Sequence, residues 1–198
     1  AGRVGSMNPQ THWVLDRLNL DAPLLLPDAS PRFKNVARRL DTALPDSPLR
    51  DAWGIANRTG GVAAIINSDG TPYGLLTGLT LFSFFEEYVG PHPNRQELRI
   101  SDLLDVPCHQ ATDTGVPRFP ANARIRDALP RIFREERNNF LVTDENGLYV
   151  GVCRQRDLLN PPRLRVVLVD HNEAEQALGA LDEVDLVEII DHHRLGNP

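Results

Sequence analysis

The sequence of 198 residues predicts an α/β fold, in which two copies of a β-α-β-β-α unit are followed by a partial Rossmann-like βαβ segment. Three observations predict it. Residues 49–82 are similar to residues 125–159, which indicates an internal repeat. The apolar run 165–169 ends in Asp170, as a buried parallel strand does. The chain has 41% hydrophobic and 24% charged residues, a balance typical of globular proteins that excludes wholesale disorder.

Charge, hydropathy and cysteine count exclude several classes of protein. A net charge of −6 argues against a surface that coats nucleic acid, because such surfaces need clustered lysine and arginine. No apolar run approaches the roughly 20 residues of a membrane span, and residues 1–10 lack the layout of a signal peptide. Cys108 and Cys153 are too few for a disulfide framework or a four-cysteine zinc site. We therefore expect a cytoplasmic protein without nucleic-acid or membrane partners.

The repeat aligns about 40 residues of the chain with themselves once a one-residue adjustment is made. Each copy has a proline-containing extended segment, a helix, a strand, an acidic turn ending in glycine, a second strand and a second helix. A unit of this size is too small to bury its sheet alone, so the two copies should pair. The expected first helices are Leu49–Asn57 and Ile125–Glu136, the strands after them are Val62–Ile66 and Phe140–Val142, the turns end at Gly70 and Gly147, and the second helices are Thr77–Phe85 and Arg154–Leu159.

Candidate ligand-binding residues stand where the last strand of each copy enters its second helix. A hydroxyl or a cation at the start of a helix can bind phosphate, and a carboxylate one turn further on can accept both ribose hydroxyls. The residues at these places are Thr77 and Thr80 in copy 1, and Arg154 and Asp157 in copy 2, and their assignment to a ligand site is what the family resemblance of these segments implies. Copy 1 reads Gly74-Leu75-Leu76-Thr77-Gly78-Leu79-Thr80 and copy 2 reads Gly151-Val152-Cys153-Arg154-Gln155-Arg156-Asp157.

This layout resembles a pair of CBS motifs, a tandem module that in many proteins binds adenine nucleotides. The pattern of that family is Gly, two apolar residues, Thr or Ser, two residues, and Asp. Copy 1 has Thr80 in place of the acid, and copy 2 has Arg154 in place of the hydroxyl, although a guanidinium also binds phosphate. The resemblance implies that AMP, ADP or ATP binds between the copies, with copy 2 contributing more. The alternative is a degenerate pair that serves only dimer packing.

The apolar helix 79–85 predicts a homodimer. It carries Leu79, Leu81, Phe82, Phe84 and Phe85. Because Phe84 and Phe85 are expected not to face the same core, part of the helix needs a second surface. The alternative cover is the segment 1–33 of the same chain.

Residues 163–198 predict part of a metal site. The apolar runs Arg165–Asp170 and Leu186–Ile190 indicate parallel strands, with a helix over Asn172–Leu181 between them. Both polar ends then emerge at one edge of the sheet, so Asp170 and His192 are expected to lie close together. A carboxylate and an imidazole on neighbouring strand tips form part of a site for a divalent metal.

The residues around these strand ends resemble the DHH phosphoesterase superfamily, and in particular family II inorganic pyrophosphatases. The resemblance implies that Asp170 and His192 bind Mn²⁺ or Co²⁺, that His193 contacts the substrate phosphate, and that Asp191 supports the histidines. It assigns no direct ligation to His171 or Asn172. The matching segments are Val169-Asp170-His171-Asn172-Glu173 and Ile190-Asp191-His192-His193-Arg194.

The N-terminal segment is similar to the part of these enzymes that lies between their first metal motif and the segment around Asp170. It comprises Ala1–Thr11 and Trp13–Leu15 and places Ala1 inside a catalytic domain, against the alternative that residues 1–6 are an expression scar. The predicted organisation is a catalytic-domain segment at 1–33, CBS motif 1 at 34–98, CBS motif 2 at 99–162, and a second catalytic-domain segment at 163–198.

As a whole, the resemblance implies the regulatory region of a CBS-containing family II inorganic pyrophosphatase, a hydrolase that converts diphosphate and water into two phosphates. The family's other metal ligands and diphosphate-binding residues have no counterpart in this sequence, so the chain alone is expected to be inactive. Two alternatives stay open: a stand-alone CBS nucleotide sensor, and a DHH phosphoesterase acting on an oligonucleotide or a cyclic dinucleotide. The segments around Asp170 and His192-His193 argue against the stand-alone sensor. Their amino-acid sequences favour a pyrophosphatase over a phosphoesterase with another substrate.

Overall fold

The computed structural model describes residues 1–89, 99–169 and 178–191. The chain divides into two compact units: unit 1 comprises Ala1–Pro31 and Pro162–Pro198, and unit 2 comprises Arg32–Pro161. Within the described ranges, no helix has both the length and the apolar character needed to cross a membrane.

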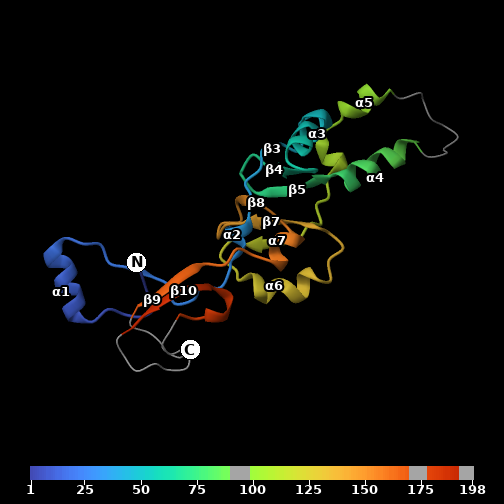
Figure 1. Ribbon diagram of the computed structural model, residues 1–198. Helices are drawn as coiled ribbons and strands as arrows, with labels where there is room; N and C mark the ends of the chain where they lie inside the picture. Colours follow the sequence, from blue (N-terminus) through green and yellow to red (C-terminus); the bar gives the residue numbers. More distant parts are fainter. Residues whose placement is uncertain (90–98, 170–177, 192–198) are drawn as a thin grey trace. The chain divides into compact units, whose positions relative to one another are not determined.

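Unit 2 contains both predicted copies of the β-α-β-β-α unit, so the predicted α/β class and tandem arrangement are confirmed (Figure 1). Copy 1 consists of β3 (Thr42–Ala43), α3 (Leu49–Arg58), β4 (Val62–Ile66), β5 (Pro72–Thr77) and α4 (Gly78–Val89). Copy 2 consists of β6 (Arg118–Pro120), α6 (Ile125–Ile132), β7 (Asn139–Thr143), β8 (Tyr149–Arg154) and α7 (Gln155–Leu159). Short helices precede the copies: α2 (Phe33–Val36) before copy 1, and α5 (Ile100–Leu104) and η1 (Cys108–Ala111) before copy 2.

Each copy has a three-stranded sheet of the same topology. Strand β3 is parallel to β4 and β4 is antiparallel to β5, and strands β6, β7 and β8 repeat this arrangement. In copy 1 Val62 lies opposite Thr77, and in copy 2 Asn139 lies opposite Arg154. Thr77 and Arg154 therefore occupy equivalent places in the two copies.

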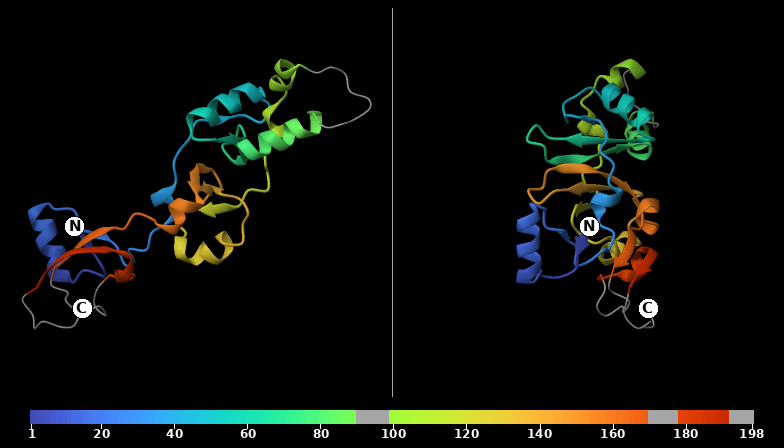
Figure 2. Two further views of the ribbon diagram at one scale, coloured as in Figure 1. Left: turned by 45° about the vertical axis from the view of Figure 1, so that its right-hand side comes forward. Right: turned by 60° about the vertical axis from the view of Figure 1, so that its left-hand side comes forward.

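The two sheets of unit 2 share an apolar core. All five residues of β4 are buried, which explains why this strand reads as a continuous apolar run and not as an alternating one. Figure 2 shows the strands of copy 1, in cyan and green, beside the orange strands of copy 2. The buried residues that join the sheets are Val62, Ala64, Ile66, Leu75, Val116, Leu141 and Val152.

The segment that leads into each copy packs on the other copy. Phe33 of α2 precedes copy 1, yet it lies in the core of copy 2, where its ring stacks on Phe119 with centroids 4.5 Å apart. Leu103 of α5 and Cys108 of η1 precede copy 2, yet they lie in the core of copy 1. The sequence does not predict this exchange, because neither segment carries a pattern that identifies its partner.

Two backbone bridges also join the segment before one copy to a strand of the other copy. Arg38 pairs with Val152, and the two N–H···O bonds have N···O distances of 2.9 Å each. Asp113 pairs with Leu75 in the same way, with distances of 2.9 and 3.1 Å. The chain before each copy is thus tied to the last strand of the opposite copy.

A glycine precedes each bridged strand residue because the crossing backbone leaves no room for a side chain. A Cβ atom on Gly74 would lie 2.7 Å from the Thr112 methyl group and closer still to the carbonyl oxygen of Asp113. A Cβ atom on Gly151 would lie 2.8 Å from the carbonyl oxygen of Arg38. These two glycines match each other in the repeat, and the close approach gives the physical reason.

The packing of α4 corrects one expectation. Phe84 is buried, and Phe85 packs on the same core, 5.6 Å from the Phe84 ring and 6.3 Å from the Trp53 ring. The prediction that Phe84 and Phe85 do not share a core is therefore wrong, because the large Trp53 ring extends the core round the helix. Leu79 and Phe82 of α4 are exposed, at 76% and 67%.

Unit 1 contains the predicted parallel strands. Strands β9 and β10 pair in parallel, and Val169 lies opposite Ile190, which confirms the predicted strand pairing. The expected helix Asn172–Leu181 lies mostly outside the described residues, and a 3-10 helix, η3, begins at Leu181. The elements are β1 (Gly2–Arg3), α1 (Pro9–Leu18), β2 (Leu24–Leu25), β9 (Arg165–Val169), η3 (Leu181–Glu183) and β10 (Asp185–Ile190), and the buried core residues are Ala29, Leu178 and Val184.

Candidate functional site

Two cavities lie where the second helix of each copy begins and faces the other copy. Cleft 1 has a volume of about 450 Å³ and is bordered by the start of α4 in copy 1. Cleft 2 has a volume of about 370 Å³ and is bordered by the start of α7 in copy 2. Cleft 1 is lined by Gly61, Leu75, Thr77, Gly78, Leu79, Thr80, Asp113, Val116, Glu136, Arg137, Asn138 and Asn139, and cleft 2 by Gly60, Asn138, Asn139, Arg154, Gln155, Arg156 and Leu159.

In cleft 1 the two predicted residues, Thr77 and Thr80, lie together and hold the start of α4. The Thr80 hydroxyl accepts a hydrogen bond from the Thr77 N–H at 2.9 Å, and the Thr77 hydroxyl accepts one from the Thr80 N–H at 3.2 Å. The Thr80 hydroxyl also donates to the Thr77 carbonyl oxygen at 3.1 Å. These hydroxyls satisfy N–H groups that the first turn of a helix otherwise leaves unpaired. Neither residue brings a charge to cleft 1.

Cleft 1 also contains an ion pair that the sequence analysis missed. Arg137 Nε donates to Asp113 Oδ2 at 2.6 Å, and Arg137 Nη2 donates to Asp113 Oδ1 at 3.4 Å. The hydrogen bond from Arg137 holds the pKa of the Asp113 carboxyl below its usual value, so Asp113 stays ionised. The two residues are 24 positions apart, and neither belongs to the repeated motif.

In cleft 2 the predicted residue Arg154 crosses to copy 1. It directly precedes α7, and its Nη2 donates to the carbonyl oxygens of Thr59 and Gly60 at 3.2 and 3.4 Å. Gly60 makes this possible, because a Cβ atom there would lie 2.5 Å from Arg154 Nη2. Burial lowers the pKa of Arg154, and the charges of Arg38 and Arg156 lower it further. Because Arg154 and Arg156 both line cleft 2, this cleft has a cationic wall.

The fourth predicted residue, Asp157, lies in the first turn of α7. Its Oδ1 is 3.6 Å from Arg156 Nε, and its side chain is 34% exposed. Asp157 is not among the described residues that line cleft 2, although its ion-pair partner Arg156 is. The structure thus brings Arg154 into the cleft and leaves Asp157 one turn further along the helix.

The predicted metal and catalytic residues are largely outside the described part of the chain. Asp170, His192 and His193 lie beyond it, and Asp191, which follows β10, is partly buried. Among the described residues, no group of three His, Cys, Asp or Glu side chains is placed to hold a metal ion. The parallel pairing of β9 and β10 is established, and the ligand set stays a prediction.

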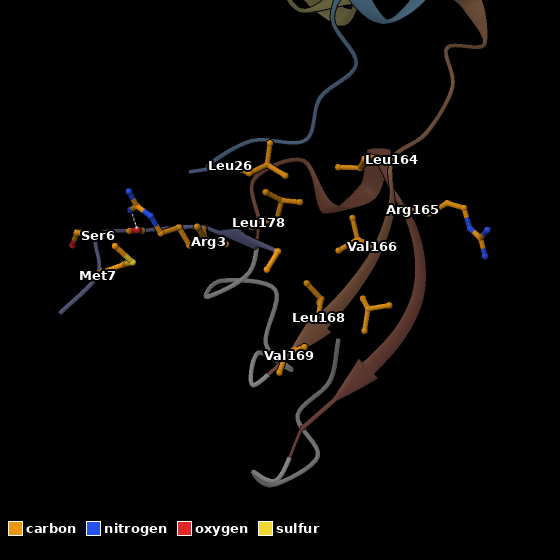
Figure 3. A pocket seen from close by; sticks show the side chains of 15 residues that line it. Arg3, Ser6, Met7, Leu26, Leu164, Arg165, Val166, Leu168, Val169 and Leu178 are labelled. Carbon is orange, nitrogen blue, oxygen red and sulfur yellow. Dashed lines mark hydrogen bonds between the residues drawn. The ribbon is translucent and has the colours of Figure 1, made fainter. Parts of the chain in front are cut away.

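Unit 1 has a cavity of its own, with a volume of about 680 Å³ (Figure 3). Its lining includes Leu26, Val166, Leu168 and Leu178, and Figure 3 shows Arg165 pointing away from it. The side chains that line this cavity are mainly apolar, whereas those that line cleft 2 are mainly polar.

Three of the residues that shape the clefts were found only in the structure: Gly60, Asp113 and Arg137. The repeat alignment holds one signal for them, since the 77-residue offset that matches Gly74 with Gly151 also matches Gly60 with Arg137. That signal identifies equivalent positions but not their role, because the role depends on which copy each side chain faces.

Comparison with known proteins agrees with this architecture. Residues 110–161 match the CBS domain family. A solved CBS domain protein from Pyrobaculum aerophilum, complexed with AMP, superposes on 67% of this chain and 93% of its own, with 16% identity and a TM-score of 0.52. The chain has the tandem CBS fold.

Curated relatives match the chain over shorter stretches. A Thermotoga maritima protein named "Probable manganese-dependent inorganic pyrophosphatase" is 45% identical over 93 residues, which cover 47% of this chain and 17% of that protein. A Clostridium perfringens "Cobalt-dependent inorganic pyrophosphatase" is 39% identical over 79 residues, which cover 37% of this chain and 14% of that protein. The match thus spans less than a fifth of either relative.

Proposed function

We propose that unit 2 is an adenine-nucleotide-binding regulatory module and that unit 1 belongs to the catalytic domain of a manganese- or cobalt-dependent inorganic pyrophosphatase. The observation that carries the proposal is the cationic wall of cleft 2, where Arg154 reaches the carbonyl oxygens of Thr59 and Gly60. The AMP complex of a protein with the same fold and the names of the curated relatives support it.

In this proposal the side chains of cleft 2 recognise the phosphate, and Asp157, next to Arg156 in α7, recognises the ribose. A guanidinium forms charge-assisted hydrogen bonds with phosphate, and Arg154 lines the cleft. Arg38 and Arg156 add positive charge that favours more than one phosphate group. Asp157 accepts the ribose hydroxyls after its exposed ion pair with Arg156 opens, which costs little at a solvated surface.

The catalytic part of the proposal concerns the whole protein. Asp170 and His192 would hold Mn²⁺ or Co²⁺, a donor set of carboxylate and imidazole that suits either ion. A bound divalent metal supplies a hydroxide nucleophile and offsets charge on the leaving phosphate. His193 would contact the substrate phosphate, and Asp191 would orient the neighbouring imidazoles through hydrogen bonds.

Isothermal titration calorimetry with AMP, ADP and ATP tests nucleotide binding directly. We expect micromolar binding, a lower affinity in Arg154→Ala, and an unchanged affinity in Arg134→Ala, which removes an exposed arginine outside both clefts. The Arg154→Ala variant should also lose part of the salt dependence, because a charged contact with phosphate has been removed. Failure of all three nucleotides to bind at millimolar concentration would leave the pair with a structural role only.

The chain by itself should not hydrolyse diphosphate measurably. It holds only part of the metal-binding set expected from the DHH resemblance. A phosphate-release assay with Mn²⁺ or Co²⁺ checks this. Turnover well above the metal-only background would contradict the expectation and reveal a complete site.

We also propose that unit 2 forms a homodimer and that nucleotides act by favouring one of its conformations. The exposed Leu79 and Phe82 of α4 and Leu159 of α7, which is 52% exposed, need cover. Phe82→Glu should give a monomer by light scattering where the wild type gives a dimer at tens of micromolar. Phe133→Glu, another exposed aromatic residue in copy 2, is the control, and a wild-type monomer would contradict the proposal.

A further inference from the structure

The turn of the second hairpin carries the only Asn-Gly pair in the sequence, Asn146-Gly147. It lies between β7 and β8, and Asn146 is exposed. We propose that Asn146 is a site of spontaneous deamidation, that the main product is isoaspartate, and that this product loosens the contact between the second hairpin and copy 1. The site does not depend on the proposed nucleotide binding.

The reaction joins the side chain of Asn146 to the backbone of Gly147. The Gly147 nitrogen attacks the side-chain carbonyl carbon of Asn146, and the new C–N bond closes a succinimide ring. The side-chain amide group leaves as ammonia and takes the proton of the Gly147 N–H with it. A water molecule then opens the ring at either carbonyl and gives aspartate or isoaspartate. Glycine favours the attack because it has no Cβ atom that would shield its nitrogen.

The first hairpin is the matched comparison, because the 77-residue offset of the repeat aligns Asp69-Gly70 with Asn146-Gly147. Both glycines have a left-handed backbone, with φ angles of 85° and 79°. Asp69 Oδ1 accepts from the Thr71 hydroxyl at 2.6 Å and from the Thr71 N–H at 2.9 Å. These two hydrogen bonds hold the pKa of the Asp69 carboxyl below its usual value, and an ionised carboxylate resists attack by an amide nitrogen.

In the second hairpin the residue before the glycine lacks this partner. Leu148 stands where copy 1 has Thr71, so the hydroxyl is absent. Asp144 holds the turn instead, since its Oδ1 accepts from the N–H groups of Asn146 and Leu148 at 2.9 and 2.8 Å. Among the described residues, no hydrogen bond reaches the side chain of Asn146. Its amide can therefore rotate toward the Gly147 nitrogen.

Protection by the ordered turn is the competing explanation. The Gly147 N–H donates to the Asp144 carbonyl oxygen, and this bond must open before the nitrogen can attack. Its N···O distance is 3.2 Å, against 2.9 Å for the equivalent bond from the Gly70 N–H to the Asn67 carbonyl oxygen. A longer bond in an exposed turn opens more readily, so the turn of copy 2 protects its amide less than the turn of copy 1 would.

Isoaspartate lengthens the main chain by a methylene group between residues 146 and 147. The residues directly after it contact copy 1. The Tyr149 N–H donates to the Gly70 carbonyl oxygen at 3.0 Å, and Leu148 Cδ2 lies 3.4 Å from the place that a Cβ atom on Gly70 would take. The Tyr149 hydroxyl also accepts from the Leu40 N–H at 3.3 Å. The longer chain shifts these contacts, so the hairpin should pack less tightly on copy 1.

Timed incubation of the whole chain at neutral and at mildly alkaline pH, followed by peptide mass spectrometry, tests the reaction. The peptide that contains Asn146 should gain the mass difference between a carboxyl and an amide group. The gain should be faster at the higher pH, because the attacking nitrogen must lose its proton. An isoaspartyl methyltransferase with a labelled methyl donor should label this peptide and leave the Asp69 peptide unlabelled.

Leu148→Thr supplies the hydroxyl that copy 1 has at Thr71. It should slow the reaction about fivefold, the effect of one additional hydrogen bond on a rate. Leu148→Val is the matched control, because it has the shape of threonine without the hydroxyl, and it should react like the wild type. Equal rates in the two variants would overturn the role assigned to the hydroxyl.

The urea-unfolded chain supplies the reference rate. A native chain that stays unmodified while the unfolded chain converts would overturn the proposal, because the turn would then protect the amide. Labelling of Asp69 at the rate of Asn146 would overturn the comparison of the two hairpins on which the proposal rests.

The effect on the contact with copy 1 is measured on the isoaspartate form, separated by ion exchange. It should unfold at a lower urea concentration than Asn146→Asp, which carries the same charge on an unaltered main chain. An equal midpoint would show that the longer main chain does not disturb the contact, and would overturn this part of the proposal.

Discussion

Cleft 1 and cleft 2 have equivalent backbones and different chemistry. In both, a bridge ties the last strand of one copy to the segment that leads into the other, with Leu75 and Asp113 in one case and Val152 and Arg38 in the other. The side chains at the start of the second helix form different hydrogen bonds in the two copies. Thr77 and Thr80 cap α4, whereas at the start of α7 no side-chain cap bond is found among the described residues, and Arg154 reaches across to copy 1.

The two copies therefore share the backbone bridge to the opposite copy, but they do not share the side chains that line the clefts. The crossing depends on glycine at two positions, because a side chain there would collide with backbone. The ligand groups depend only on charge reaching the cleft, and a guanidinium has the length to do so from either wall. Duplicated units can therefore diverge in binding while they keep one architecture.

The largest effects should follow from filling the space at the two glycines. Gly74→Ala should lower the free energy of unfolding by about 3 kcal/mol and Gly151→Ala by about 2 kcal/mol, since overpacking against backbone relaxes poorly. Gly74 is expected to be the more sensitive, because its Cβ would approach the crossing backbone more closely than that of Gly151. Urea unfolding of both variants measures the difference.

Gly54→Ala is the control for this comparison. Gly54 lies inside α3, where a Cβ atom would meet only the end of the Arg58 side chain at 3.6 Å. This substitution should be neutral or stabilising by up to about 1 kcal/mol, because alanine favours the helix. A Gly74→Ala variant as stable as Gly54→Ala would show that the crossing at Asp113 is not tightly packed.

Asp157→Ala should affect AMP binding and leave the stability of the fold nearly unchanged. We expect it to weaken AMP binding by about 1–3 kcal/mol, because a pair of ribose hydroxyls loses its acceptor. The free energy of unfolding should change little, since the ion pair of this carboxylate is with the exposed Arg156. Calorimetry and urea unfolding of the same sample check both halves, and wild-type affinity in Asp157→Ala would remove the ribose role from copy 2.

Thr80→Ala should give the opposite result at the equivalent position of copy 1. Loss of the two hydrogen bonds that the Thr80 hydroxyl makes with the Thr77 backbone should lower the free energy of unfolding by about 1 kcal/mol, the usual cost of a removed helix cap. AMP affinity should stay close to that of the wild type, because a hydroxyl does not replace a two-oxygen acceptor for ribose. A large loss of affinity without loss of stability would contradict the capping role.

The order of elements in unit 2 could be predicted from the sequence because its signals are local. Strand Val62–Ile66 was predicted with its observed bounds, since a buried apolar run between two glycine-containing turns has one interpretation. Helix α6 ends at Ile132 and not at Glu136, because the chain leaves the helix through tighter bonds, such as Glu135 N–H to the Ile132 carbonyl at 3.1 Å. Such an end has no clear sequence pattern.

The candidate site could be predicted only in part, for a related reason. Thr77, Thr80 and Arg154 line the clefts, since each stands at a fixed place in the repeated motif, and their role in binding stays a prediction. The Arg137 and Asp113 pair depends on two copies facing each other, and the stacking of Phe33 on Phe119 depends on the exchange of leading segments. Contacts between distant segments follow from topology, which one sequence does not specify.

The smallest expected effect is on the alkylation rates of the two cysteines, one of which lies in each copy. Cys108 lies in the core of copy 1 and Cys153 in that of copy 2, next to Arg154. Burial raises the pKa of the Cys108 thiol to about 11 and that of the Cys153 thiol to about 12. Both pKa values exceed the ordinary value of 9.0, so the thiols contribute stability below pH 9 that is lost as the pH rises toward 11 and 12.

At pH 8 both thiols should therefore resist alkylation in the folded protein and react only when the surrounding core opens. AMP bound in cleft 2 should slow the labelling of Cys153 more than that of Cys108, because the ligand stabilises the end of β8 against opening. The rates are measured by mass spectrometry after timed alkylation, with and without AMP. In Arg154→Ala the protection of Cys153 should disappear while Cys108 labels as before. Equal slowing of both cysteines by AMP would mean that the copies open as one unit and that their clefts are not independent.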